Sequence, residues 1–234
     1  MDKLNVIVSG GFWEAYQEAL PKFERATGIT VNTLSGASQG TGPKTIAWQL
    51  ANGTPIDVVI LSREGLDELV AAGRIAQGSD VALARVALAA AVRQGQPKPD
   101  IRTLDTFTRA LLDARLVVMP GSTSGLFVKE VVFPKLGITE SVSAKVLPRG
   151  TDSTAMLAAG DADLALGPVS ELVGQPGIDL VAPLPDAVQL VQIFTAAIVK
   201  TSRRVPEAET LIAFLSSNRT EAAIRRFGME PAGA

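Results

Sequence analysis

The chain has 234 residues, 47% of them apolar, which is enough to bury the core of one large domain or of two small ones. Its 22 Lys and Arg against 24 Asp and Glu give a formal net charge of −2, so neither nucleic acid nor an anionic membrane surface is expected as a partner. Cys and His are absent, which excludes a thiol nucleophile, a Ser-His-Asp triad and a Cys or His zinc site. We therefore expect neither a metal nor a cofactor.

The N-terminal segment has no feature of a secretory signal. Met1 is followed almost at once by an apolar strand pattern, with no basic region, long apolar stretch or small-residue cleavage site. We expect a cytoplasmic location for the chain as written, and a periplasmic one if Met1 begins an engineered mature form. No apolar run reaches about 18 residues, so no membrane insertion is expected.

Strand-like and helix-like segments alternate through the first third of the chain. Apolar spacing and glycine stops predict strands at 4–8, 29–34 and 56–61 and helices at 12–26, 43–51 and 66–72. The third strand is apolar throughout, which is typical of a parallel strand covered on both faces. Such alternation predicts right-handed βαβ units and an α/β fold.

The rest of the chain continues the pattern after a less certain segment. Residues 81–92 are apolar and predict a strand of a second lobe, although their alanine content leaves a helix open. Residues 94–99 predict a surface loop. Further strands are expected at 116–119, 143–147, 162–166 and 188–199, and helices at 104–114, 126–136, 151–159, 206–216 and 220–227.

Small, hydroxyl-rich loops follow several of the predicted strands. In parallel α/β sheets these loops lie at the carboxyl edge, where ligands bind, and each precedes a helix whose first N–H groups are free to hold an anion. The simpler interpretation is that these residues are helix caps and tight turns. The loop residues are Ser9, Gly10, Gly11, Ser38, Gln39, Ser62, Ser122, Thr123, Ser124 and Gly125. Arg63 could clamp a carboxylate, or form an ordinary surface ion pair.

Four segments, at 23–31, 49–59, 158–163 and 213–228, together resemble the molybdate-type branch of the ABC transporter substrate-binding proteins. Their sequences are FERATGITV, QLANGTPIDVV, AAGDAD and AFLSS through to Phe227-Gly228. The resemblance implies a type II periplasmic binding protein fold, with two α/β lobes, a ligand cleft between them and hinge closure. It places one lobe at 1–81 plus 190–234 and the other at 82–189. It also implies a monomer, with an ABC transporter permease as partner if the chain is exported.

The family's oxyanion site can be carried over position by position. Its two first-lobe serines fall on Gly11 and on or beside Ser38. Its second-lobe positions fall on Ser124, on Gly150-Thr151 beside Asp152, and near Pro168 for a tyrosine. Gly11 and Pro168 cannot supply a hydroxyl. These departures, and a longer loop at 35–43 that carries Gln39 and Lys44, favour a larger ligand such as a small organic carboxylate.

Two functions remain open. The first, which we favour, is a solute-binding protein that captures a small anion through hydroxyls and helix N-termini and needs neither acid nor base. The alternative is an isomerase of a small polycarboxylate, as in the aconitate isomerases, which resemble this branch. That reaction needs a base and cationic anchors, for which the candidates are Glu14, Lys44, Arg63, Arg149 and Asp152.

Overall fold

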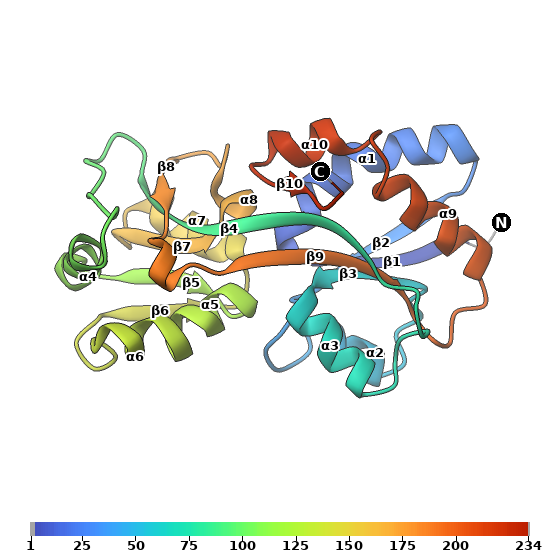
Figure 1. The fold of residues 1–234 in the computed structure, drawn as a ribbon, viewed down its shortest axis with the longest axis horizontal. Coiled ribbons are helices and arrows are strands. Elements are labelled where there is room, and N and C mark those ends of the chain that lie inside the picture. The colour runs from blue at the N-terminus through green and yellow to red at the C-terminus, as the bar shows by residue number, and fades with distance from the viewer. Residues whose placement is uncertain (1–2, 234) are drawn as a thin grey trace. The chain divides into compact units, whose positions relative to one another are not determined.

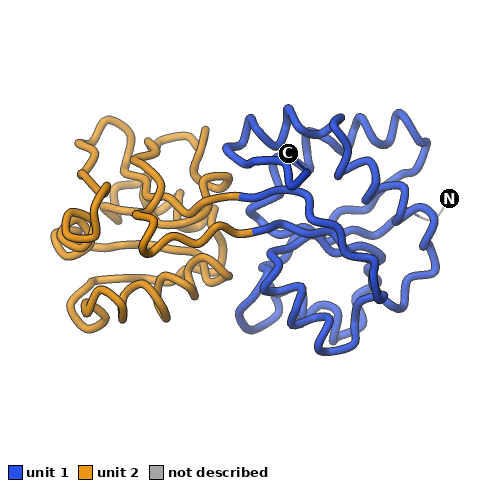
Figure 2. The backbone as a smooth tube through the Cα atoms, viewed as in Figure 1, with its two compact units in different colours: residues 1–85, 193–234 blue, residues 86–192 orange. Residues whose placement is uncertain are grey.

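The computed structural model describes residues 3–233 and divides into two compact units. Unit 1 comprises residues 1–85 and 193–234, and unit 2 comprises residues 86–192 (Figure 2). The chain passes between them inside two long strands, β4 (Val81–Arg93) and β9 (Val191–Ile198). Since both strands continue through the crossings, no turn marks the boundaries. The unit boundaries fall a few residues later than the boundaries at 81/82 and 189/190 that the sequence predicts.

Unit 1 is built on the sheet order β2-β1-β3-β9. The strand β1 pairs in parallel with both β2 and β3, and β9 runs antiparallel to β3. The elements are β1 (Leu4–Val8), α1 (Gly10–Thr27), β2 (Val31–Ser35), α2 (Ile46–Ala51), β3 (Val58–Ser62), α3 (Arg63–Ala71), α9 (Val205–Leu215), α10 (Glu221–Arg226) and β10 (Glu230–Pro231). The parallel βαβ start that the sequence predicts is confirmed.

Helices cover both faces of the unit 1 sheet (Figure 1). On one face, α2 and α3 bury Ile46, Leu66 and Leu69 against the alternate strand residues Val59 and Leu61. On the other face lie α1, α9 and α10. Phe23 of α1 packs edge-on against Phe214 of α9, with ring centroids 5.5 Å apart. This double cover explains why β3 is buried at every position.

Unit 2 has the sheet order β4-β7-β5-β6, with β8 also paired to β4. The strand β5 is parallel to β6 and β7, and β4 is antiparallel to β7. Its elements are α4 (Leu104–Asp113), β5 (Val117–Pro120), α5 (Thr123–Phe127), the π-helix η1 (Val128–Val132), α6 (Phe133–Leu136), β6 (Ala144–Leu147), α7 (Gly150–Ala159), β7 (Leu164–Pro168), α8 (Val169–Leu172), β8 (Ile178–Pro183) and the 3₁₀ turn η2 (Asp186–Val188).

Alternate residues of β4 serve the two faces of the unit 2 sheet. Leu88, Ala90 and Val92 pack with α4 and with the helical stretch from α5 to α6. Ala89 and Ala91 pack instead with α7 and α8. This two-residue alternation, with antiparallel partners on both sides, identifies 81–93 as a strand and removes the helical alternative.

Several element boundaries differ from those expected. The helix expected at 43–51 begins only at Ile46, because Thr45 accepts a capping hydrogen bond from the N–H of Trp48. The helix expected at 126–136 begins at Thr123 and includes a π-helical turn. The long strand expected at 188–199 starts at Val191, after the 3₁₀ turn. The short elements α8, β8 and β10 carry no periodicity long enough to be predicted.

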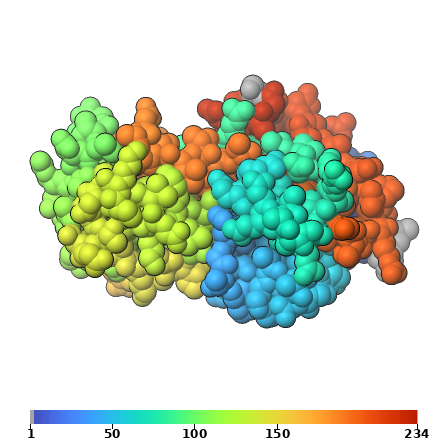
Figure 3. Space-filling model, turned by 60° about the horizontal axis from the view of Figure 1, so that its bottom comes forward, coloured from blue at the N-terminus to red at the C-terminus, as the bar shows by residue number. Residues whose placement is uncertain are grey.

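Figure 3 shows the solvent-facing surfaces of α2 and α3 in light blue to cyan and those of α5 to α6 in yellow-green. Within residues 3–233, no helix combines the length and the hydropathy needed to cross a bilayer.

Candidate functional site

The predicted loops of unit 1 meet at the carboxyl edge of its parallel strands. The register aligns Val8 of β1 with Ser35 of β2 and with Ile60 of β3. Ser9 continues β1 and donates its N–H to the carbonyl of Ile60 at 2.8 Å. The edge therefore collects Ser9, the loop that contains Ser38, and Ser62.

Most polar groups of this edge are engaged in holding the fold. The hydroxyl of Ser62 caps α3 by accepting the N–H of Gly65 at 3.3 Å, and the hydroxyl of Ser38 accepts the N–H of Ser62 at 3.0 Å. The amide of Gln39 donates to Glu68 at 2.6 Å. These contacts give Ser38, Gln39 and Ser62 structural roles, whether or not a ligand also reaches them.

The cationic and acidic candidates of unit 1 also lie outside a buried site. Arg63 forms an ion pair with Asp80 at 3.0 Å. This is the ordinary surface ion pair that the sequence left open as an alternative to a carboxylate clamp. Glu14 and Lys44 are exposed.

Ser9 behaves differently from its neighbours. It is buried, with 3% of its surface exposed, and it precedes the 18-residue helix α1 without making a side-chain capping bond. Its hydroxyl has no hydrogen-bond partner among residues 3–233. Buried polar atoms are nearly always paired, so an unpaired hydroxyl beside a helix N-terminus is a strong candidate for ligand contact.

Gly11 is explained by packing. A Cβ built at this position would lie 2.1 Å from Cζ of Phe194 in β9. The Phe194 ring is itself buried and lies 6.1 Å from the ring of Phe12. An apolar ring edge therefore occupies the place where the molybdate-type pattern has a serine side chain.

Two further groups at this edge escaped the sequence analysis. Thr195 lies opposite Leu61 in the β3–β9 pairing and is fully buried, and its hydroxyl has no partner in the described chain. One carboxylate oxygen of Glu64, in the first turn of α3, is also buried and has no partner in the described chain. For Thr195, the sequence offers one signal, a single hydroxyl within the otherwise apolar run Phe194–Ile198. That run predicts a strand but does not by itself indicate a site residue.

The predicted loops of unit 2 also share one edge. The register aligns Pro120 of β5 with Leu147 of β6, and β7 lies on the other side of β5. Thr123 and Ser124 are buried in the first turn of α5, and Ser122 precedes it without a side-chain capping bond. Gly125 is required by packing, since a Cβ there would lie 1.8 Å from the carbonyl oxygen of Pro120.

The first turn of α7 completes this edge. Thr151 is exposed, Asp152 is half-buried, and Arg149 before them is exposed and makes no side-chain capping bond. Gly150, the first residue of α7, faces Glu171 of α8. A Cβ at Gly150 would lie 2.0 Å from Oε2 of Glu171 and 3.3 Å from its Oε1. The carboxylate of Glu171 thus occupies the space beside the start of α7.

Glu171 is the most perturbed acid of unit 2. Its Oε2 is inaccessible to solvent and has no partner within the part of the chain that the structure describes. Burial raises the pKa of its carboxyl to about 7. Glu171 lies three residues after the predicted position Pro168, and no local sequence pattern distinguishes it from an ordinary helix acid.

Two neutral side chains of unit 2 also have a buried polar atom without a partner in the described chain. Ser170 and Gln192 are each 3% exposed, and the Ser170 hydroxyl and the Gln192 side-chain oxygen have no partner in residues 3–233. Ser170 directly precedes Glu171 and follows Pro168. Ser170 and Glu171 therefore carry uncommitted polar atoms directly after β7, which the family pattern did not indicate.

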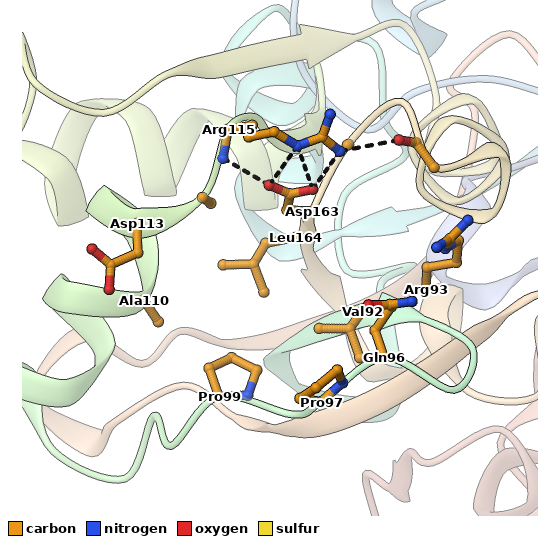
Figure 4. Close-up of a pocket in the computed structure, with 13 residues that line it drawn as sticks. Val92, Arg93, Gln96, Pro97, Pro99, Ala110, Asp113, Arg115, Asp163 and Leu164 are labelled. Carbon is orange, nitrogen blue, oxygen red and sulfur yellow. Dashed lines mark hydrogen bonds and ion pairs between the residues drawn. The ribbon is translucent and has the colours of Figure 1, made fainter.

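A separate hollow of about 360 Å³ lies at the opposite edge of unit 2 (Figure 4). Arg115 and Asp163 precede β5 and β7, and their side chains form a bidentate ion pair with a shortest contact of 2.7 Å. The guanidinium of Arg115 lowers the pKa of Asp163. This pair joins the amino ends of two strands, away from the hydroxyl-rich loops, so the hollow is a structural feature.

No cluster of three or more acidic side chains suited to a metal ion occurs in residues 3–233.

Comparisons with known proteins find relatives that match almost the whole chain. An aconitate isomerase from Pseudomonas sp is 36% identical over 232 residues, covering 99% of this chain and 88% of that protein. Among solved structures, the periplasmic molybdate-binding protein of Azotobacter vinelandii matches with a TM-score of 0.73 at 19% identity, covering 97% of this chain and 98% of that one. The sulfate-binding protein SubI of Mycobacterium tuberculosis H37Rv matches with a TM-score of 0.77 at 19% identity, covering 99% of this chain and 88% of that one.

These structural neighbours confirm the two-lobed periplasmic binding protein fold that the sequence predicts. The family model described as bacterial extracellular solute-binding protein matches residues 4–230. The chain therefore belongs to the family of bacterial extracellular solute-binding proteins.

Proposed function

We propose that this protein binds a small organic polycarboxylate of the aconitate type. The observation that carries the proposal is the environment of position 11, where the edge of the Phe194 ring takes the place of a serine side chain. A compact oxyanion such as molybdate is held by a full set of hydroxyl and N–H donors, so replacing one donor with an apolar edge disfavours it. A carboxylate joined to a carbon skeleton can place that skeleton against the ring.

Similarity supports the same ligand class. The relative with 36% identity over almost the whole chain is named as an aconitate isomerase, whereas the molybdate and sulfate binders are below 20% identical. Helix N-termini and hydroxyls, which both units present, bind carboxylates without a cationic clamp. In a transport role, the bound anion would be delivered to an ABC transporter permease, and we expect the protein to act as a monomer.

A panel of ligands in thermal unfolding tests the proposal. A ligand that binds only the folded state raises the midpoint by mass action. We expect cis- or trans-aconitate to raise it and molybdate, tungstate and sulfate to leave it unchanged at equal concentration. Stabilisation by molybdate or tungstate alone would contradict the proposal.

Ser9→Ala sharpens this test. Hydrogen bonds to charged groups contribute about 1.5–3 kcal/mol, so the variant should bind aconitate about 10-fold to 100-fold more weakly. Its free energy of unfolding should change by less than about 0.5 kcal/mol, because the Ser9 hydroxyl has no partner within residues 3–233. Ser62→Ala is the matched control. Its hydroxyl caps α3, so that variant should lose about 1 kcal/mol of stability.

A second candidate function is isomerisation of the bound polycarboxylate. The specific observation in its favour is Glu171, a buried carboxylate without a hydrogen-bond partner for Oε2 in the described chain. Incubating the protein with trans-aconitate and following the cis and trans signals by NMR separates the two functions. A binding protein returns the ligand unchanged, and an isomerase does not.

A further inference from the structure

The surroundings of Glu171 have the features of a proton-transfer site. The side chain extends from α8 to the first residue of α7, where both carboxylate oxygens lie within 3.3 Å of the position that a Cβ at Gly150 would occupy. Glycine at 150 is therefore what allows the carboxylate to reach the helix start. Any larger residue would force Glu171 out of this position.

The start of α7 is suited to hold a carboxylate of a ligand beside Glu171. α7 has ten residues. The N–H groups of Asp152 and Ser153 already donate to the carbonyl of Arg149, so those of Gly150 and Thr151 are the ones that the helix itself cannot satisfy. The N-cap residue, Arg149, supplies no side-chain capping bond. Ser170, next to Glu171 in the chain, is 3% exposed, and its hydroxyl has no partner in residues 3–233. This is a second polar group that is available to a ligand.

The charge environment leaves Glu171 able to exchange a proton near neutral pH. The charged residues on the neighbouring elements are Arg149 and Asp152 at the start of α7 and Asp179 in β8. Asp179 accepts the N–H of Gly95. The raised pKa of Glu171 has burial as its cause. A general base works best when its pKa lies near the working pH.

We propose that Glu171 is the catalytic residue of a polycarboxylate isomerisation, taking a proton from one carbon of the substrate and returning it to another. This inference rests on the proposed binding of an aconitate-type ligand. The carboxylate removes one proton from the methylene carbon, and the electron pair of the broken C–H bond delocalises over the three-carbon allylic unit. The double bond moves by one position, and the proton is delivered to the far carbon of that unit.

The step is balanced and needs no other reactant. One C–H bond breaks and one forms, the double bond is retained, and Glu171 ends in its starting ionisation state. The negative charge that develops on the substrate spreads into its carboxylate groups. N–H groups at the start of α7 would stabilise that charge.

The test compares Glu171→Gln and Glu171→Asp with the wild-type protein. Glu140→Gln makes the same chemical change at an exposed position of unit 2 and is the control. Each protein is incubated with trans-aconitate, and the cis to trans ratio is followed by NMR. Binding is measured separately by the aconitate-dependent rise of the thermal midpoint, which also shows that each variant is folded.

We expect the wild type and Glu140→Gln to isomerise aconitate at equal rates. Glu171→Gln should be slower by about 100-fold or more, with aconitate affinity within a few-fold of the wild type. Glu171→Asp keeps a carboxylate and should retain more activity than Glu171→Gln. Isomerisation by Glu171→Gln at the wild-type rate would overturn the inference. Wild-type protein that binds aconitate and returns it unchanged would overturn it while leaving the proposed binding function intact, and absence of binding would overturn both.

Discussion

Replacing Glu171 with glutamine should make the protein more stable than the wild type above neutral pH. The carboxyl has a pKa of about 7 when folded, against 4.5 ordinarily. Below pH 4.5, folded and unfolded chains both hold the proton and the group contributes its full stability. Between pH 4.5 and 7 the unfolded chain releases the proton while the folded chain keeps it. Stability therefore falls as pH rises, and the loss is complete above pH 7.

The size of this effect follows from the shift. One pKa unit corresponds to about 1.4 kcal/mol, so a rise from 4.5 to about 7 corresponds to about 3 kcal/mol lost between acidic and alkaline pH. Glutamine has nearly the same shape and cannot ionise. The variant should match the wild type near pH 4.5 and exceed it by about 3 kcal/mol at pH 8.

The assay is urea unfolding of both proteins at pH 5, 6, 7 and 8, without ligand. The difference between their unfolding free energies isolates Glu171, because all other titrating groups are shared. Glu140→Gln, the same substitution at an exposed position, is the control. A difference for Glu171→Gln that stays constant across this range would refute the raised pKa of the buried Glu171 carboxyl. It would also remove the electrostatic support for proton transfer.

Two further predictions concern packing and hydrogen bonding in unit 1. Gly11→Ser should lower stability by about 1–3 kcal/mol, because its Cβ would overlap the Phe194 ring. Gly233→Ala, which meets open space, is the control, and equal midpoints for both would contradict the packing. Asp57→Ala should cost at least about 2 kcal/mol in urea unfolding, since its carboxylate accepts the N–H of Asn5 at 2.9 Å and the hydroxyl of Ser202 at 2.7 Å. A loss below about 0.5 kcal/mol would count against these bonds.

The fold could be predicted because its main signals are local. The apolar run that forms β3 and the helical spacing of α1 each indicate their element without knowledge of the rest of the chain. β4 could not be assigned this way. Its alanines fit a helix or a strand equally, and the choice is made by the antiparallel partners β7 and β8, which lie far along the chain.

The segments that carried the family resemblance hold the fold together. Asp57 joins β3 to the start of β1 and to the chain after β9. Gly160 ends α7 in a left-handed conformation, and Asp163 binds Arg115 at the amino end of β5. Such residues identify the architecture, and for that reason they carry little information about the ligand.

The candidate site was predictable only in part. The hydroxyls lie at the carboxyl edges because strand order and register place them there. Tertiary contacts decide which of these hydroxyls have a hydrogen-bond partner within the protein and which do not. Ser38 is paired with Ser62 while Ser9 has no partner in the described chain, and no local pattern separates the two cases. Likewise, one carboxylate oxygen of Glu171 is buried while Glu14 is exposed, although both are helix acids.

The three glycines Gly11, Gly125 and Gly150 show why composition alone could not locate the chemistry. Each stands near the start of a helix that follows a strand, which from sequence suggests a loop that admits an anion. In the structure the first makes room for an aromatic ring, the second for a strand carbonyl and the third for a carboxylate. Only at Gly150 does the missing side chain bring an ionisable group to a helix N-terminus. The identity of the group that fills the space therefore separates a packing glycine from one that serves a reaction.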